Sequence, residues 1–319
     1  MLKIGKLKLS SPLILAPLSG VSNLPFRMIN RDYGCELAFC EMISARALVY
    51  NKVKTKQMIV SSSGDRPLGV QLLADDAEII KRALDILRPC KFDLIDLNAG
   101  CPAPKVAKKG QGAGLLTEPA KLKSLLKALA GNSPSPATVK IRAGWCDKSV
   151  NAREIALICQ EAGAKAIFVH GRTRSQGYRG QVNYQVIREV KEAVDIPVIG
   201  SGDIFDALSA KKMFEETGCD ALLAARGSLG NPWIFKEIEE YLKHGRVREK
   251  PALEEVVAVM KKHLKLCVEF FGERIGVVIF RKYFIWYTKG FHHIRHLRRE
   301  AFATEDKEGM LRVIEKVLS

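Results

Sequence analysis

Reactive and polar side chains stand just after short apolar runs at several places in this sequence. Cys101 lies in the segment Asn98-Ala99-Gly100-Cys101-Pro102, where a thiol on a proline-stiffened loop could donate a proton to a substrate. Gln71 closes an earlier apolar run, and Lys140 and Arg142 close a later one. A packed thiol is the more common fate of a cysteine, so spacing alone leaves the role of Cys101 open.

A flavin ring would fit these strand ends. The pyrimidine edge of an isoalloxazine presents carbonyls and nitrogens to donors such as Gln71, and Lys140 beside that edge would stabilise the negative charge of the reduced ring. Glycine-rich turns at residues 200–202 and 225–227 would offer backbone N–H groups to a phosphate, with Arg226 adding positive charge. The alternative is that these glycines only close tight turns.

Three glycine-containing segments extend this pattern. The segment Ala16-Pro17-Leu18-Ser19-Gly20 ends the first apolar run with small residues, against which a flat ring could lie. The segment His170-Gly171-Arg172-Thr173-Arg174 ends the sixth run with a histidine and two arginines. The segment Gly110-Gln111-Gly112-Ala113-Gly114 resembles a dinucleotide fingerprint, but it does not directly follow an apolar run and lacks the expected acidic residue. We therefore interpret it as a flexible loop segment over the active site.

Eight short apolar runs alternate with longer helical patterns. Most runs are continuously apolar, as expected for parallel strands that are covered on both faces. Eight such units over about 235 residues predict a (β/α)8 TIM barrel, whose chemistry lies at the C-terminal ends of the strands, with a doubly wound open sheet as the alternative. The predicted strands are residues 13–16, 37–41, 68–72, 93–97, 138–141, 166–169, 197–199 and 221–224, and the predicted helices include 77–87, 120–129, 152–162, 184–193 and 207–216.

The pattern changes after about residue 245. Pro251 opens a helical stretch that runs through Phe270, and further helical patterns continue to Ser319 without a strong strand signal. The sequence therefore predicts a TIM-barrel catalytic domain at residues 1–243 and a smaller C-terminal all-helical domain at residues 244–319.

The formal net charge of +16 favours a polyanionic partner, most simply a nucleic acid. A basic enzyme without such a partner is the alternative. Residues 281–299 carry six basic side chains and no acidic one, with aromatic residues interleaved. We expect most of these aromatics to pack in a core and the charges to bind RNA. The basic residues are Arg281, Lys282, Lys289, Arg295, Arg298 and Arg299, and the aromatics are Phe280, Tyr283, Phe284, Trp286, Tyr287 and Phe291.

Other features bear on metals and on the cellular compartment. His292, His293 and His296 have a helical spacing that could hold a metal, but no carboxylate or cysteine cluster accompanies them, so a wet basic surface is favoured. Eight scattered cysteines form no CxxC pair, which predicts free thiols in a reducing compartment. The apolar run near the N-terminus is too short and proline-rich for a signal peptide, and no run reaches the length of a membrane span. A cytoplasmic location without membrane attachment is therefore expected.

Together these motifs resemble the tRNA-dihydrouridine synthase family over nearly the whole chain, with a layout closest to the bacterial B-type branch. The combination of Asn-x-Gly-Cys-Pro with a downstream His-Gly-Arg-Thr is specific for it. The matching segments are Ala16-Pro17-Leu18-Ser19-Gly20-Val21, Pro25-Phe26-Arg27, Gln71-Leu72, Asn98-Ala99-Gly100-Cys101-Pro102, Val139-Lys140-Ile141-Arg142, Val169-His170-Gly171-Arg172-Thr173, Gly202-Asp203-Ile204, Arg226-Gly227 and Asn231-Pro232-Trp233-Ile234-Phe235.

The resemblance implies reduction of the C5–C6 bond of uridines in tRNA, with FMN as cofactor, NADPH as transient reductant and a helical RNA-binding domain. Hydride would pass from FMN N5 to C6, and Cys101 would be the general acid that protonates C5. A monomer is expected. By position, the FMN-binding residues would be Ala16, Pro17, Leu18, Gln71, Lys140, His170, Ser201, Gly202, Asp203, Ala225 and Arg226, and the substrate-binding residues Asn98, Arg142, Arg172 and Arg174.

The sequence departs from the family pattern at two positions. Ser201 stands where the family often has asparagine, and Ala225 stands where it often has glycine. Because the backbone N–H of Ala225 remains, we expect weaker or shifted FMN contacts at most. Two other functions compete with this one: an FMN barrel that acts on a free small molecule, similar to dihydroorotate dehydrogenase, and an RNA-binding module without catalysis. Intact Cys101 and Lys140 argue against the second.

Overall fold

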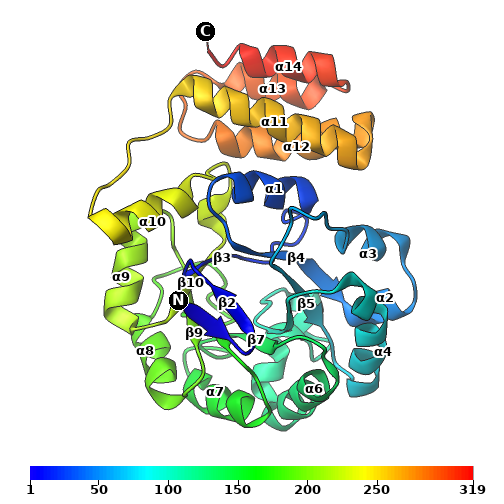
Figure 1. Cartoon of the computed structure of the whole chain (residues 1–319), viewed down its shortest axis with the longest axis vertical. Coiled ribbons are helices and arrows are strands. Elements are labelled where there is room, and N and C mark those ends of the chain that lie inside the picture. Colours follow the sequence, from blue (N-terminus) through cyan, green and yellow to red (C-terminus); the bar gives the residue numbers. More distant parts are fainter. Residues whose placement is uncertain (319) are drawn as a thin grey trace.

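The computed structural model describes residues 1–318, without the side chain of Lys54. Eight parallel strands close into a barrel in the order β10-β3-β4-β5-β6-β7-β8-β9 (Figure 1). Because every strand pairs on both sides, this sheet has no free edge. The predicted TIM barrel is confirmed. The strands are β3 (Leu13–Leu15), β4 (Leu37–Ser44), β5 (Leu68–Leu73), β6 (Leu94–Ala99), β7 (Ala137–Arg142), β8 (Ile167–His170), β9 (Val198–Ser201) and β10 (Ala221–Ala224).

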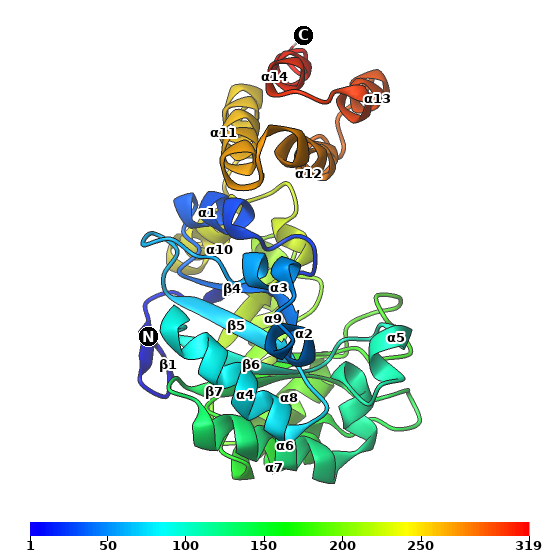
Figure 2. The same cartoon turned by 90° about the vertical axis from the view of Figure 1, so that its right-hand side faces the viewer.

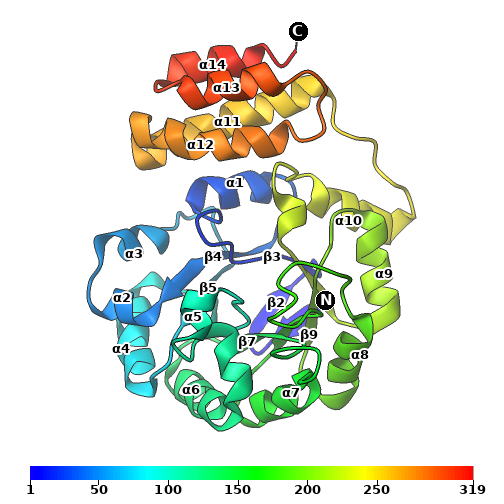
Figure 3. The same cartoon turned by 180° about the vertical axis from the view of Figure 1, so that it is seen from behind.

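Helices surround the barrel and cover the outer face of its strands (Figures 1 and 3). Their order along the chain alternates with that of the strands, as the apolar runs and helical patterns predict. The helices are α1 (Leu24–Asp32), α2 (Ala45–Val49), α3 (Val53–Met58), α4 (Ala77–Leu87), α5 (Pro104–Ala107), α6 (Pro119–Asn132), α7 (Ala152–Glu161), α8 (Tyr184–Ala193), α9 (Ala207–Thr217) and α10 (Ile234–His244), with 3-10 turns η1 (Arg88–Cys90), η2 (Gly112–Thr117) and η3 (Arg226–Ser228).

Local capping residues set where several of these helices begin and end. The side chain of Asp76 accepts from the backbone N–H groups of the first turn of α4, which have no partner within the helix. Asp206 and Ser209 form a reciprocal capping box at the start of α9. Gly218 ends α9 in a left-handed conformation at φ 65°, which a residue with a side chain adopts less readily. The bounds of α4 agree with the predicted range 77–87, and α9 extends one residue beyond the predicted range 207–216.

A short antiparallel hairpin lies at the N-terminal end of the barrel strands (Figure 2). It consists of β1 (Leu2–Ile4) and β2 (Leu7–Leu9), and the apolar pattern does not predict it. Its buried residues Leu2, Ile4 and Leu9 pack against the apolar interior of the barrel. Each strand has only three residues, so its alternating pattern is too short to distinguish from chance.

Four helices follow the barrel and form a second layer beside α1 (Figures 1 and 2). They are α11 (Leu253–Phe271), α12 (Glu273–Tyr287), α13 (Arg295–Ala303) and α14 (Lys307–Glu315). A segment at residues 245–252 connects them to α10. These helices confirm the predicted all-helical C-terminal part. Within residues 1–318, no helix has the length and apolar character needed to cross a bilayer.

Candidate active site

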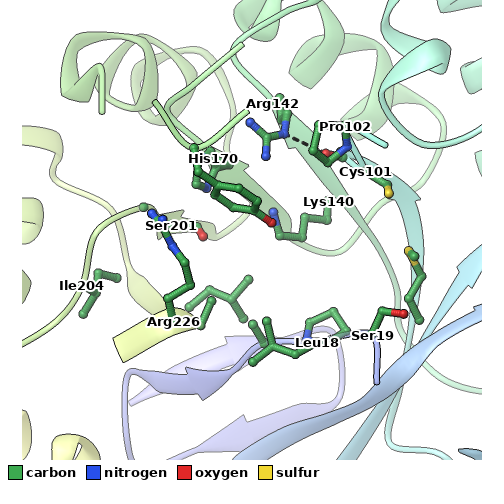
Figure 4. Close-up of a pocket in the computed structure, with 18 of the residues that line it drawn as sticks. Leu18, Ser19, Cys101, Pro102, Lys140, Arg142, His170, Ser201, Ile204 and Arg226 are labelled. Atoms are coloured by element: carbon green, nitrogen blue, oxygen red, sulfur yellow. Dashed lines mark hydrogen bonds between the residues drawn. The ribbon is translucent and has the colours of Figure 1, made fainter. Parts of the chain in front are cut away.

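A cavity opens at the C-terminal ends of the barrel strands, the end opposite to the β1–β2 hairpin. Residues from every strand end contribute to it. Figure 4 shows Cys101 and Pro102 across the cavity from Ser201 and Arg226, with Lys140 between them. Of the sequence-predicted residues, those that line the cavity are Ala16, Pro17, Leu18, Gln71, Asn98, Cys101, Lys140, Arg142, His170, Ser201, Gly202, Asp203, Ala225 and Arg226.

The loop that carries Cys101 is held from two sides. Asn98 Oδ1 accepts from the backbone N–H of Gly100 at 3.1 Å and from that of Cys101 at 2.8 Å. On the other side, the N–H of Ala113 donates to the carbonyl of Cys101 at 3.0 Å. Because three hydrogen bonds fix its backbone, the thiol has a defined position at the cavity wall.

The prediction of a flexible loop at Gly110–Gly114 is wrong. Residues 112–114 begin the 3-10 helix η2 and are buried against the Cys101 loop. Gly112 has φ +57°, and a Cβ there would come within 2.9 Å of Cys101 Cβ. The glycines are therefore needed for close packing, not for mobility. The sequence signal is the same in both cases, because glycine serves loops and tight contacts alike.

A buried hydrogen-bond chain joins Gln71, Asp96 and Asn98 inside the barrel. Gln71 Nε2 donates to Asp96 Oδ2 at 2.8 Å, and Asn98 Nδ2 donates to Gln71 Oε1 at 2.6 Å. Thr138 Oγ1 donates to Asp96 Oδ1 at 2.7 Å. Burial raises the pKa of Asp96 to about 7, against the opposing effect of these donors and of Lys140. These hydrogen bonds fix the orientation of the Gln71 side-chain amide, and they therefore determine which of its edges faces the cavity.

Asp96 is absent from the predicted site residues because it stands within an apolar run and not just after one. Its position two residues before Asn98 places both side chains on the same face of β6, toward the barrel interior. That period-two spacing is the signal that could have found it.

Lys140 is a cation without a direct partner at the cavity floor. Its side chain makes none of the side-chain hydrogen bonds or ion pairs found among residues 1–318. Burial, and next the nearby Arg142, lower its pKa to about 8. Burial also holds the pKa of His170 well below its usual range, and the positive charges of Lys140 and Arg142 act in the same direction. This imidazole is therefore neutral. His170 Nε2 is buried and has no hydrogen-bond partner in the described part of the chain.

The side chain of Arg142 links two loops of the site by hydrogen bonds. Its Nε donates to the carbonyl of Gly100 at 2.8 Å, and its Nη1 donates to the carbonyls of Thr173 and Gly177 at 3.0 and 2.9 Å. The side chain is almost completely buried, and burial lowers its pKa to about 10. Arg142 therefore ties the Cys101 loop to the loop that follows β8.

A second charged group lies where β9 and β10 end. Asp203, with φ +51°, accepts from Arg226 Nη2 at 2.6 Å and from Arg172 Nη1 at 3.0 Å. Gly202 has φ +131°, and a Cβ there would come 2.7 Å from the side chain of Val182. This left-handed turn therefore requires glycine at 202 and directs the cationic Arg226 over the cavity.

Two predicted substrate residues do not line the cavity. Arg172 is 2% exposed. Its guanidinium donates hydrogen bonds to the Asp203 carboxylate and to the carbonyls of Arg179 and Gly180. Arg174 stacks on the ring of Trp145 at 4.6 Å. The structure therefore places Arg172 behind Asp203, where it acts as support. Both arginines follow β8, but the chain turns away from the cavity after His170.

Two aromatic residues at the mouth of the cavity were not predicted. Tyr178 is 57% exposed, and the guanidinium of Arg226 stacks on its ring at 4.6 Å. Phe205 is 46% exposed, and the central carbon of the same guanidinium lies 5.6 Å from the centroid of its ring. Exposed aromatics at a cavity mouth are suited to stacking on a planar ligand. Both lie in loops without periodicity, so no spacing pattern marks them as site residues.

The basic segment of the helical part divides into two groups. Phe280, Tyr283, Phe284 and Tyr287 are buried, which confirms that most of its aromatics form a core. Three basic side chains donate to carbonyls of the protein: Arg281 to Thr304, Lys282 to Gly20 and Arg298 to Thr288. Lys289, Arg295 and Arg299 are exposed.

The predicted helical spacing of the three histidines does not form. His292 and His293 precede α13, which begins at Arg295, and all three histidines are exposed. His293 has φ 54°, and its carbonyl contacts His296 Nδ1 at 2.9 Å. Among residues 1–318, no group of three His, Cys, Asp or Glu side chains is arranged to hold a metal.

The fold and site define a barrel protein with a thiol, a lysine and an arginine cluster around one cavity. Residues 14–319 match the model of the dihydrouridine synthase (Dus) family, and the chain belongs to this family. It is similar to tRNA-dihydrouridine synthase B of Vibrio parahaemolyticus, at 38% identity over 93% of this chain and 92% of the relative. It is also similar to tRNA-dihydrouridine synthase B of Pseudomonas aeruginosa, at 36% identity over 96% and 92% of the two chains.

Among solved structures, the fold resembles morphinone reductase in complex with tetrahydroNAD. The TM-score is 0.57 at 12% identity, over 80% of this chain and 92% of that one. A likeness at this identity supports the barrel fold and carries no conclusion about the ligand.

Proposed function

We propose that this chain reduces the C5–C6 bond of a uridine in tRNA, with FMN as resident cofactor and NADPH as reductant. The observation that carries the proposal is the pairing of the fixed Cys101 thiol with a free lysine on the floor of one cavity. Membership of the dihydrouridine synthase family and the names of the bacterial relatives support tRNA as the substrate.

The cavity residues fit FMN. His170 Nε2 is a buried polar atom without a protein partner, which a flavin or its ribityl chain could satisfy. Lys140 would face the N1–O2 edge of the ring, and Gln71 has one remaining amide hydrogen, because its other polar contacts go to Asp96 and Asn98. Arg226 and the turn at residues 201–203 would hold the phosphate. Bound and reduced FMN supplies the hydride for uracil C6.

The protein's own part in the reaction is proton delivery and placement. Cys101 would hold a proton at Sγ and pass it to C5 of the uracil. Asn98, Ala113 and Arg142 keep the loop of Cys101 in place through the bonds described above. Because the Asp96 network at the cavity floor is buried, the base would react in a site sheltered from bulk solvent.

Exposed cations near this cavity suit an RNA substrate. Lys105, Lys108 and Lys109 lie on and just after α5, which directly follows the Cys101 loop, and all three are exposed (Figure 2). We propose that they contact tRNA phosphates together with Lys289, Arg295 and Arg299 of the helical part. In this proposal residues 1–243 form the catalytic domain and residues 244–319 the tRNA-binding domain.

The test is to supply the purified protein with FMN, NADPH and unmodified tRNA transcript, and to measure dihydrouridine by mass spectrometry of nuclease fragments. Parallel reactions contain free uridine or orotate in place of tRNA. We expect a mass increase of two hydrogens in one tRNA fragment and no reduction of the free compounds. Reduction of the free compounds with untouched tRNA would instead favour the small-molecule barrel enzyme.

A further inference from the structure

Three consecutive backbone carbonyls in the loop after β3 accept hydrogen bonds from side chains on two helices, α1, which directly follows the loop, and the distant α12. Gly20 O accepts from Lys282 Nζ, and Val21 O accepts from the hydroxyl of Tyr283 at 2.8 Å. Ser22 O accepts from Arg27 Nη1 at 2.7 Å. Arg27 belongs to α1, whereas Lys282 and Tyr283 belong to α12 of the helical part. Two of the three ties on this loop therefore come from outside the barrel.

This loop also forms one wall of the candidate active site. Leu18 and Ser19 line the cavity, and Figure 4 shows both across from Lys140. The backbone N–H of Leu18 donates to Ser22 Oγ at 2.9 Å, and the N–H groups of Val21 and Ser22 both donate to Leu18 O at 3.0 Å. A displacement of residues 20–22 is therefore passed directly to Leu18.

Close packing and a hydrogen bond hold Tyr283 in place between α12 and the loop. Tyr283 is 1% exposed, its ring stacks on Phe26 with centroids 5.7 Å apart, and it lies tilted against the ring of His263 with centroids 4.2 Å apart. Its hydroxyl also accepts from Asn23 Nδ2 at 2.8 Å. Lys282 is half-buried, and the carboxylate of Glu41 accepts from the N–H of Gly20 beside it. The positions of α12 and the loop are thus coupled.

We propose that Lys282 and Tyr283 are positioning residues of the flavin site, through which the helical part shapes the cavity wall at Leu18 and Ser19. This inference rests on the proposed function for the identity of the ligand. It gives the helical part a second role beside RNA binding: α12 completes the cofactor site. The two parts of the chain meet at this place: α1 packs against α11 (Figures 1 and 2), and the loop before α1 accepts its hydrogen bonds from α12.

The chain offers matched controls for this role. Lys262 pairs with Asp32 at 2.7 Å, so it also ties the helical part to α1, but it does not contact the loop. Tyr287 is buried on the same helix as Tyr283, and its hydroxyl contacts His263 Nδ1 at 3.1 Å. Lys262→Met and Tyr287→Phe therefore repeat the chemical changes of Lys282→Met and Tyr283→Phe at sites away from the loop.

The first measurement is amide hydrogen exchange of the full-length apoprotein, read on peptides that cover residues 16–23. We expect exchange at Val21 and Ser22 to rise about fivefold in Lys282→Met and in Tyr283→Phe, since each change removes one hydrogen bond from the loop. Lys262→Met and Tyr287→Phe should leave this segment unchanged. Lys282→Arg should restore protection, because it keeps a cationic donor.

The second measurement is FMN affinity by quenching of flavin fluorescence, together with the dissociation constant for tRNA. We expect Lys282→Met and Tyr283→Phe to weaken FMN binding by about fivefold and to leave tRNA affinity close to that of the controls. Equal exchange in the test and control variants would overturn the proposal, as would raised exchange with unchanged FMN affinity. If the wild type binds no FMN, the proposed function fails, whereas the exchange data still decide whether α12 holds the loop.

Discussion

The two ends of the barrel are built from different kinds of residue. At the N-terminal end, the β1–β2 hairpin seals an interior of aliphatic and aromatic side chains, including Ile14, Phe39 and Phe168. At the C-terminal end, the interior contains the hydrogen-bonded layer of Gln71, Asp96 and Thr138 below the cavity. One end is closed by packing alone, and the other is held by polar contacts.

The residues that stabilise the barrel and the residues of the candidate site therefore lie toward opposite ends of the barrel axis. Apolar packing at the closed end needs no specific partner for each group, whereas each buried polar group at the open end needs one. Among the residues that line the cavity, the side chains of Lys140 and His170 differ, because neither Lys140 Nζ nor His170 Nε2 has a hydrogen-bond partner among the described residues. The open end therefore keeps unpaired polar groups where a ligand can use them.

The largest expected effect is at the open end. Cys101→Ala should lower the rate of dihydrouridine formation by about 10²–10⁴-fold, as expected for loss of a general acid, without lowering the melting temperature. Single-turnover rates from flavin reoxidation in the presence of tRNA measure this. Cys146→Ala, on a loop outside the cavity, should retain the wild-type rate. If Cys101→Ala kept that rate too, another group would be the proton donor.

At the closed end, a packing change should affect stability only. Ile4 is fully buried in the hairpin, so Ile4→Ala should lower the free energy of unfolding by about 2–5 kcal/mol. Chemical denaturation measures this, with the exposed Lys3→Ala as control. The FMN affinity of the folded variant should stay at the wild-type value. A weakened affinity at a temperature where the variant is folded would show that the two ends are not independent.

Lysines at the two ends of the barrel should differ in their contribution to tRNA binding. Replacing Lys105, Lys108 and Lys109 together with alanine should weaken tRNA binding about tenfold. The slope of log K against log salt concentration should become shallower by about one for each phosphate contact that is lost. The matched control replaces Lys3, Lys6 and Lys8, which lie on the hairpin at the opposite end. Binding isotherms at several salt concentrations measure both. Equal losses in the two triple variants would indicate only a general effect of net charge.

The smallest expected effect is a pH dependence of cofactor binding. Because the pKa of Lys140 is about 8 in the free protein, this lysine is charged below pH 8 and loses its proton above it. An anionic ligand beside it raises that pKa, so FMN affinity should fall as pH rises above 8, by at most about tenfold per pH unit. Lys140→Met should bind FMN more weakly and without this dependence. A constant wild-type affinity from pH 7 to 9.5 would contradict a charged contact.

Much of the site could be predicted because it follows from the strands. Each apolar run marks a strand, parallel strands in a closed barrel point the same way, and so the residues just after them must meet at one end. Gln71, Cys101, Lys140 and Arg226 lie at such strand ends, and all four line the cavity, although the role of Cys101 is implied only by the family resemblance. Aliphatic packing tolerates many arrangements, so the apolar pattern was sufficient to define the barrel.

The tertiary structure decided what depends on partners far away in the chain. Arg172 turns to Asp203, and Gly112 packs under Cys101 in place of forming a mobile loop. The sequence separation is 42 residues between Thr138 and Asp96 and 262 between Tyr283 and Val21. A hydrogen bond needs its donor and acceptor within about 3 Å and well aligned, and no periodicity records such a pairing. The sequence by itself therefore determined the barrel and the end at which its chemistry lies, and only the folded chain determined which side chains face a ligand and which support them.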